Sequence, residues 1–172
     1  LAFGVCLAVP ELRLGFSAYL QHLFQGMDLT DGAGNLSPLL LLANNLRACA
    51  VTMLYGLIPF VRLPALALGV NAVLLGGLAA CYAATDTTML LYAASLLPHG
   101  IFELPALILA FSMGLYICGH LTRRCRRDPA ALPLGACLGL AARLLVFLLL
   151  PLLILAALTE AYVTPLAAGL FL

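Results

Sequence analysis

The chain carries, at residues 134–158, the stretch LGACLGLAARLLVFLLLPLLILAAL, in which Arg143 is the only charged residue. A membrane-spanning helix requires about 20 consecutive, mostly apolar residues. This stretch exceeds that length, and Pro151 within it predicts a bend in the helix rather than its end. We therefore expect a transmembrane helix here.

Three earlier stretches have a similar length and apolarity. They are residues 39–60, 65–84 and 101–121. Residues 1–9 are also apolar and are expected to form part of a first helix. Residues 11–27 carry apolar side chains at helical spacing, which predicts an amphipathic helix on the outer membrane surface.

Two apolar segments, 87–97 and 161–172, are too short to span a bilayer. The first ends at Pro98 and the second contains Pro165, which indicates half-helices at membrane depth. An interfacial position, or a share in a sixth helix, is also open for both. The predicted fold is all-α: a polytopic transmembrane bundle of five to six helices with one or two short half-helices, one of them near Pro98.

The composition indicates a single integral membrane domain over residues 1–172. Hydrophobic residues make up 65% of the chain and charged residues 9%, whereas soluble domains carry roughly a quarter charged residues. The mean hydropathy is +1.14. The lipid bilayer is the expected surroundings, and the net charge of +1 leaves no basic face for nucleic acid. The six cysteines lie mostly in apolar runs and predict no disulfide framework.

The arginines predict the orientation in the membrane. Arg123, Arg124, Arg126 and Arg127 cluster within residues 122–133, and Arg62 lies within residues 61–64. The positive-inside rule places these two connections in the cytoplasm. Residues 10–38 and 85–98 are then expected outside.

Several polar residues interrupt the apolar spans. Five are expected to be buried polar groups that converge in space and could bind a ligand: Asn44, Asn45, Asn71, His99 and Glu103. Three more are expected to form structural ion pairs: Arg47, Arg143 and Glu160. A charge at the centre of a membrane helix costs about 2.5–3.5 kcal/mol, so such residues normally face the bundle interior and pair. Arg143 could pair with Glu160, Glu103 or Asp128, and Arg47 could pair with Glu103 or reach the headgroups.

His99 and Glu103 are four residues apart and share one face of a helix. Three interpretations of the polar set remain open. The side chains could join helices by hydrogen bonds worth about 0.6–2 kcal/mol each, they could bind an ion or a polar solute, or they could act in catalysis.

Known catalytic motifs are absent, because the chain contains no HExxH, GxSxG, P-loop or GxGxxG pattern. No enzymatic activity and no cofactor are therefore predicted. Cys118, His120 and Cys125 offer three ligands where structural zinc sites need four, so no metal is expected there. Gly135 and Gly139 form a GxxxG motif, which permits a homo-oligomer.

The stretch LPHGIFELPA at residues 97–106 resembles the signature of the Stage II sporulation protein M family. Three further features resemble the same family. They are Asn44-Asn45 early in a span, Asn71 followed by Gly76 in the next, and the closing segment AALTEAYVTP at residues 156–165. The resemblance covers residues 38–172, while residues 1–37 are similar in character only.

This resemblance implies a multi-pass protein of the bacterial cytoplasmic membrane that acts in engulfment during endospore formation. It implies a non-enzymatic scaffold of a peptidoglycan-remodelling complex, which recruits cell-wall hydrolases as partners. The polar residues support two alternatives. One is a transporter or channel-like protein for ions or small solutes that uses the buried Asn, His and Glu side chains. The other is an intramembrane enzyme that uses His99 and Glu103.

Overall fold

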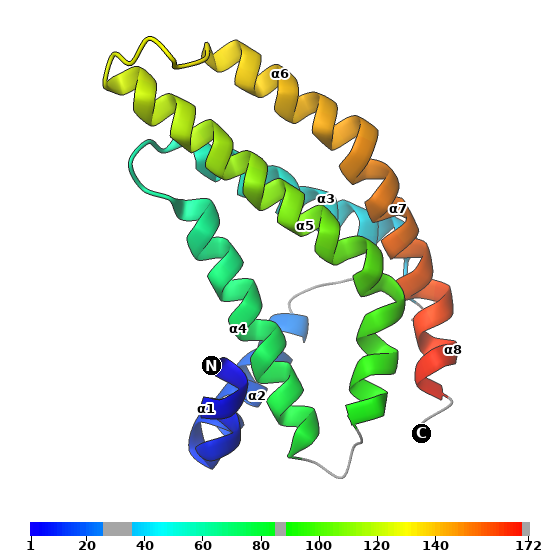
Figure 1. Cartoon of the computed structure of the whole chain (residues 1–172). Helices are drawn as coiled ribbons and strands as arrows, with labels where there is room; N and C mark the ends of the chain where they lie inside the picture. The colour runs from blue at the N-terminus through cyan, green and yellow to red at the C-terminus, as the bar shows by residue number, and fades with distance from the viewer. Residues whose placement is uncertain (26–35, 85–88, 170–172) are drawn as a thin grey trace.

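A computed structural model describes residues 1–25, 36–84 and 89–169, and every regular element in these ranges is helical. The α-helices are α1 (Ala2–Ala8), α2 (Pro10–Gln25), α3 (Pro38–Leu54), α4 (Leu63–Ala83), α5 (Met89–Cys125), α6 (Leu134–Leu144), α7 (Leu150–Leu158) and α8 (Thr164–Gly169). A 3₁₀ turn, η1 (Tyr55–Leu57), extends α3. Two π-helical turns, η2 (Leu145–Leu149) and η3 (Thr159–Val163), join α6, α7 and α8 into one continuous helical segment, residues 134–169, which we call the last rod. The all-α fold predicted from the sequence is confirmed (Figure 1).

Four helical segments are long and apolar enough to cross a membrane. They are Pro38–Leu57, Leu63–Ala83, Met89–Cys125 and Leu134–Ala167. Helices α1 and α2 would together supply a fifth crossing, although they meet at an angle of 116°. Each predicted span lies within one of these segments or overlaps it closely.

The two short segments differ from the prediction, because each belongs to a longer helix. The first lies in α5, which continues through Pro98 and Pro105 and bends in its N-terminal third (Figure 1). Proline removes one backbone hydrogen bond, but packing against neighbouring helices lets the rest of a membrane helix persist. The second segment, 161–172, completes the last rod through η3 and α8. Residues 87 and 88 of the first segment and residues 170–172 of the second lie outside the described residues.

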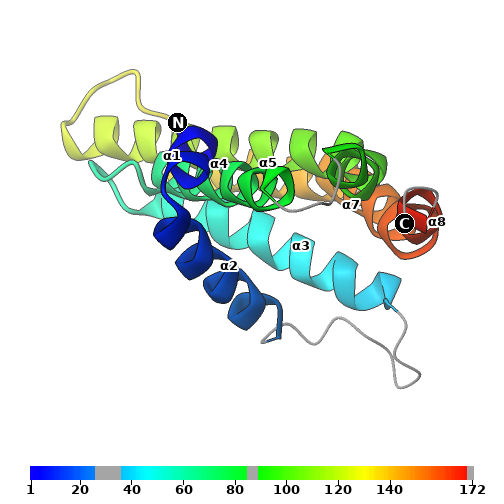
Figure 2. The same cartoon turned by 90° about the horizontal axis from the view of Figure 1, so that it is seen from below.

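The α1–α2 pair packs against glycines of α4. A Cβ atom on Gly76 would lie 3.3 Å from the backbone nitrogen of Phe3, and a Cβ atom on Gly77 would collide with the ring of Phe16. A side chain at Gly76 or Gly77 would therefore displace the α1–α2 pair or the ring of Phe16. Helix α2 then leads away from the bundle (Figure 2). It includes most of the predicted surface helix, residues 11–27, of which residues 26 and 27 lie outside the described residues.

The core lies between α3, α5 and the last rod. It consists of small and medium apolar side chains at helical spacing, among them Cys49, Ala106, Ala110, Ile117, Cys137, Leu149 and Leu153. Small residues on α5 let the neighbouring helices approach closely, as is common in membrane bundles.

A close approach joins the end of α3, η1 and the start of α4 to the middle of α5. A Cβ atom on Gly114 would lie 2.7 Å from the carbonyl oxygen of Thr52 and 2.8 Å from Cγ of Pro64, while one on Gly56 would collide with the carbonyl of Gly114. Nearby, the backbone N–H of Phe60 donates a 2.9 Å hydrogen bond to Oγ1 of Thr122. The α3–α4 and α5–α6 connections therefore meet at one end of the bundle, as predicted for two loops on the same side of a membrane (Figure 1).

Candidate functional site

Three ionisable side chains gather between α5 and the last rod, and we call His99, Glu103 and Glu160 the His/Glu cluster. His99 and Glu103 stand one turn apart on α5, in line with the buried stripe that continues at Ala106 and Ala110. Glu160 lies in η3, in line with the buried Ala156. The cluster therefore occupies the position of the next layer of the core, where apolar side chains would otherwise pack.

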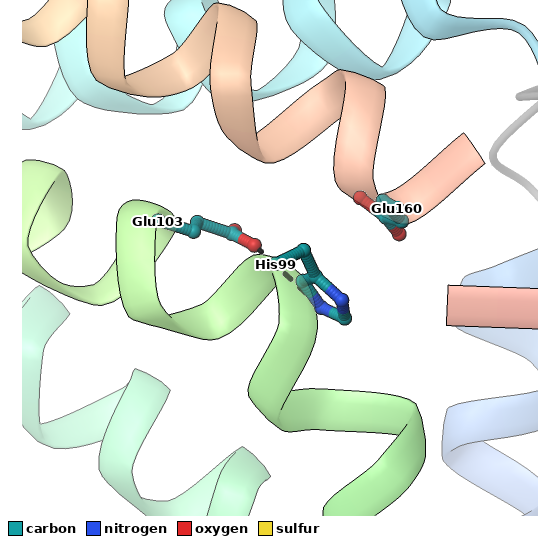
Figure 3. Close-up of side chains that lie close together, drawn as sticks. All are labelled: His99, Glu103 and Glu160. Atoms are coloured by element: carbon teal, nitrogen blue, oxygen red, sulfur yellow. Dashed lines mark ion pairs between the residues drawn. The ribbon is translucent and has the colours of Figure 1, made fainter. Parts of the chain in front are cut away.

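The ligand atoms of the three residues all lie within 4.8 Å of one another. Nε2 of His99 is 4.0 Å from Oε2 of Glu103, and these side chains are 12% and 24% exposed. Figure 3 shows that Glu160 approaches the pair from the facing helix. One imidazole and two carboxylates can hold a proton or a cation between them.

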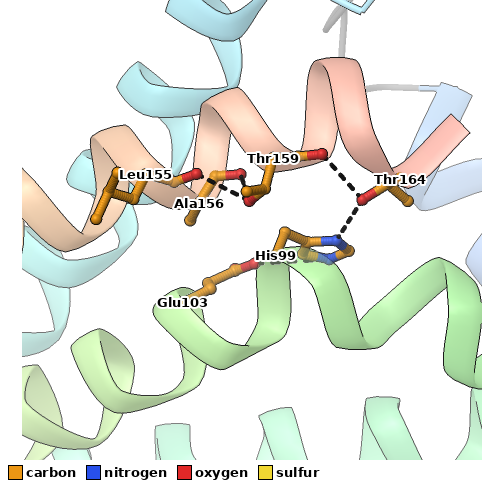
Figure 4. Close-up of polar contacts among 6 residues, drawn as sticks. All are labelled: His99, Glu103, Leu155, Ala156, Thr159 and Thr164. Atoms are coloured by element: carbon orange, nitrogen blue, oxygen red, sulfur yellow. Dashed lines mark hydrogen bonds and ion pairs between the residues drawn. The ribbon is translucent and has the colours of Figure 1, made fainter. Parts of the chain in front are cut away.

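A chain of hydrogen bonds orients the histidine ring (Figure 4). Nδ1 of His99 lies 3.2 Å from Oγ1 of Thr164. The Thr164 hydroxyl in turn donates to the carbonyl oxygen of Thr159, at 3.2 Å. When the hydroxyl gives its single proton to that carbonyl, it accepts a hydrogen bond from Nδ1–H of the histidine. Nε2 is directed to the carboxylate of Glu103.

The arginines expected to neutralise these carboxylates lie elsewhere, and Arg47, Arg143 and Glu160 form none of the predicted ion pairs within the described residues. Within residues 1–25, 36–84 and 89–169, the His99–Glu103 contact is the only ion pair. Arg47 is exposed because it lies two residues, about 200° of helical rotation, from the buried Asn45 and Cys49. Arg143 is likewise exposed, two residues beyond the buried Ala141. Packing of the apolar stripes sets the rotation of each helix and turns these arginines outward.

Asn71 and Glu103 line the same cavity, which lies between α4 and α5 and has a volume of about 220 Å³. Its other walls are apolar and include Leu75, Leu104 and Phe111. The Asn71 amide donates a 3.1 Å hydrogen bond to the carbonyl of Ala67 in its own helix. Glu103 thus borders this cavity and also belongs to the His/Glu cluster.

The predicted convergence of the polar residues is met by Asn71, His99 and Glu103, which lie in or beside the cavity and the cluster. Asn45 is 9% exposed on the core-facing side of α3, and Asn44 is half-buried beside it. Neither asparagine lines the cavity. The role of Glu160 in the cluster was not foreseen. Its spacing from the apolar positions of the last rod, which keeps it on the core-facing side, could have indicated it.

The arginines of the two connections line a hollow at the opposite end of the bundle. Arg62, Arg123 and Arg126 border a cavity of about 580 Å³. The guanidinium of Arg126 lies 5.7 Å from the ring centroid of Phe60, a cation–π contact. The residues predicted to face the cytoplasm thus form one positively charged surface.

The two segments that carry the family resemblance meet at the His/Glu cluster, since residues 97–106 contain His99 and Glu103 and residues 156–165 contain Glu160. No curated protein and no solved structure matches the chain. The model of one family, described as Stage II sporulation protein M, matches residues 5–165, which extends the resemblance back into α1. The chain therefore belongs to the Stage II sporulation protein M family, a family of membrane proteins linked to sporulation.

Proposed function

We propose that this protein is a non-enzymatic membrane scaffold of the complex that remodels peptidoglycan during engulfment, and that it recruits cell-wall hydrolases to the bacterial cytoplasmic membrane. The observation that carries the proposal is the family match over residues 5–165, which includes part of α1 and all of α2 to α7. Family membership alone is an analogy for function, so the proposal also needs a surface where partners could bind.

Helix α2 supplies such a surface. It lies at the end opposite the arginine-rich connections, where Phe16 packs against Gly77 of α4 and Leu20 is buried. Leu12, Leu14 and Tyr19 are 54%, 67% and 54% exposed. Exposed large apolar side chains that continue beyond a membrane bundle are suited to bind a partner helix or another protein surface.

Complementation tests this proposal. A sporulating host that lacks its own Stage II sporulation protein M would express the full chain with an affinity tag, and the membrane fraction would be examined for co-purified hydrolases. We expect restored engulfment and recovery of the hydrolases. Replacing Tyr19 by Ser should lower that recovery at unchanged protein level, because it removes an exposed aromatic contact. The matched control is Leu66→Ser on α4, whose side chain is 65% exposed on a different helix. Engulfment without hydrolase recovery, or equal effects of the two substitutions, would contradict the proposal.

The cavity between α4 and α5 favours a second candidate, a transporter or channel-like protein for a small solute or ion. Asn71 and Glu103 place polar groups on an otherwise apolar wall, the usual character of small-ligand sites. Replacing Ala72, which also lines the cavity, by Phe would fill it. A transporter would lose flux in proteoliposomes, whereas a scaffold would keep its partner binding.

The enzymatic alternative rests on His99 and Glu103, a pair that could exchange a proton. Glu103→Gln keeps the shape of the side chain and removes its negative charge. Full complementation by Glu103→Gln would eliminate the enzymatic alternative and any solute binding that depends on this charge. It would leave the scaffold proposal intact.

A further inference from the structure

His99 lies between Thr164 of the last rod and Glu103 of its own helix. In the tautomer whose Nδ1–H donates to Thr164, which leaves the Thr164 hydroxyl free to donate to Thr159, the neutral ring has an unshared electron pair on Nε2. That atom faces Oε2 of Glu103 at 4.0 Å. In this tautomer the two electron-rich atoms repel each other unless a proton or a metal cation lies between them.

The carboxylate of Glu160 favours a metal cation over a proton at this point. Glu160 brings a second negative charge within 4.8 Å of the other ligand atoms, and all three residues are half-buried. A buried carboxylate without a partner is costly. Within the described parts of the chain, no arginine forms an ion pair with either carboxylate. One proton on the imidazole would neutralise one carboxylate, whereas a divalent cation would neutralise both.

We propose that His99, Glu103 and Glu160 bind one divalent transition-metal ion of the Zn²⁺ or Mn²⁺ class. Imidazole and carboxylate ligands suit these ions. Ligand atoms around tetrahedral zinc lie about 3.4 Å apart, from metal–ligand distances of about 2.1 Å. Nε2 of His99 and Oε2 of Glu103 are 4.0 Å apart, and all three ligand atoms lie within 4.8 Å of one another. Rotation of the two flexible glutamate side chains can bring these atoms to about 3.4 Å. Three protein ligands leave a fourth position for water or for a group from a partner.

Thr164 acts as a positioning residue in this site. Hydrogen bonds to the non-ligating nitrogen of a histidine fix its tautomer and orientation and strengthen metal binding. Here Thr164 connects that nitrogen to the backbone of η3, the π-helical turn that also contains Glu160. Such turns are frequent at functional sites. The bound ion would join α5 and the last rod, which are otherwise joined by apolar packing and by the contact between His99 and Thr164.

The full chain, purified in detergent micelles and treated with EDTA, provides the test. ZnCl₂ or MnCl₂ is then added, and bound metal is measured by mass spectrometry of the elements alongside the thermal unfolding midpoint. We expect one metal ion per chain and a rise in the midpoint, because an ion that binds only the folded state stabilises it. His99→Gln, Glu103→Gln and Glu160→Gln should each abolish both effects. Thr164→Val should weaken binding by about 10–100-fold, the usual loss when a hydrogen bond to a metal-binding histidine is removed.

Glu11→Gln is the matched control, because Glu11 is exposed on α2, away from the cluster. It should bind metal like the wild type. A wild type that binds no metal would overturn the proposal, as would cluster variants that still bind it. Glutamine variants that are more stable than the wild type without any metal would identify a shared proton instead.

X-ray absorption of the zinc-loaded wild type requires no variant and keeps the test valid if a variant fails to fold. The proposal predicts only nitrogen and oxygen ligands, with one imidazole. Sulfur ligands would assign the metal to the free cysteines and overturn it. The scaffold proposal is tested separately by hydrolase recovery, so each proposal can fail alone.

Discussion

Replacing Gly114 by Ala tests the close packing that organises the bundle. The added Cβ atom would lie 2.7 Å from the Thr52 carbonyl oxygen, and 2.8 and 3.1 Å from Cγ and Cβ of Pro64. Carbon atoms in contact prefer about 3.5–4.0 Å, so the end of α3 and the start of α4 would have to move away from α5 by roughly 0.5–1 Å. The neighbours are backbone and a proline ring, which cannot rotate away. We expect a loss of about 1–3 kcal/mol in the free energy of unfolding, the usual cost of overpacking.

Gly119→Ala is the matched control, because it lies in the same helix and its Cβ atom would meet nothing within 4 Å. Alanine favours a helix over glycine by about 1 kcal/mol, so this variant should be as stable as the wild type or more stable. Reversible unfolding in mixed micelles, followed by circular dichroism, measures both variants. Equal stability of Gly114→Ala and Gly119→Ala would refute the inferred contact between these backbones.

Arg127→Gly should stabilise the protein by about 1 kcal/mol, because Arg127, two residues beyond the end of α5, has a left-handed φ of 57° that favours glycine. A less stable variant in the same unfolding assay would contradict this. Thr122→Val should cost about 0.5–1.5 kcal/mol, because it removes the hydrogen bond from the backbone of Phe60. Ser112→Ala is its control, since the Ser112 hydroxyl donates only within its own helix. Equal losses of stability in the two variants would show that the hydrogen bond between Phe60 and Thr122 does not stabilise the contact of the two connections. Cys125 is exposed at the arginine-rich end and should react with a membrane-impermeant maleimide only after the cells are permeabilised. Labelling of Cys125 in intact cells would contradict the predicted orientation.

The bundle was largely predictable because membrane helices leave a strong signal. Long apolar runs such as 134–158 have few alternatives in a bilayer. The positions of the helix ends were less predictable at prolines. Pro98 reads as a helix end in the sequence, yet α5 continues through it, because its neighbours supply the packing that keeps the helix together.

The site was predictable only in part, because sequence spacing reveals the face of one helix but not which faces meet. The separation of four residues correctly placed His99 and Glu103 together. The partner of Glu160 depended on how the last rod is rotated against α5, which the apolar core determines. Arg143 was a reasonable partner by charge, but its helix presents Ala141 to the core instead.

The length of α5 determines which compartment the His/Glu cluster can reach. The helix is continuous from Met89 to Cys125, so His99 lies 24 residues, about 36 Å along the axis at 1.5 Å per residue, from Arg123. With a typical tilt of about 20°, that is about 34 Å of depth, slightly more than the roughly 30 Å of a hydrocarbon core. If Arg123 marks the cytoplasmic boundary, His99 lies at the opposite boundary. Ions or protein groups from the outer aqueous phase would reach the cluster there, whereas those of the cytoplasm would first have to cross the bilayer.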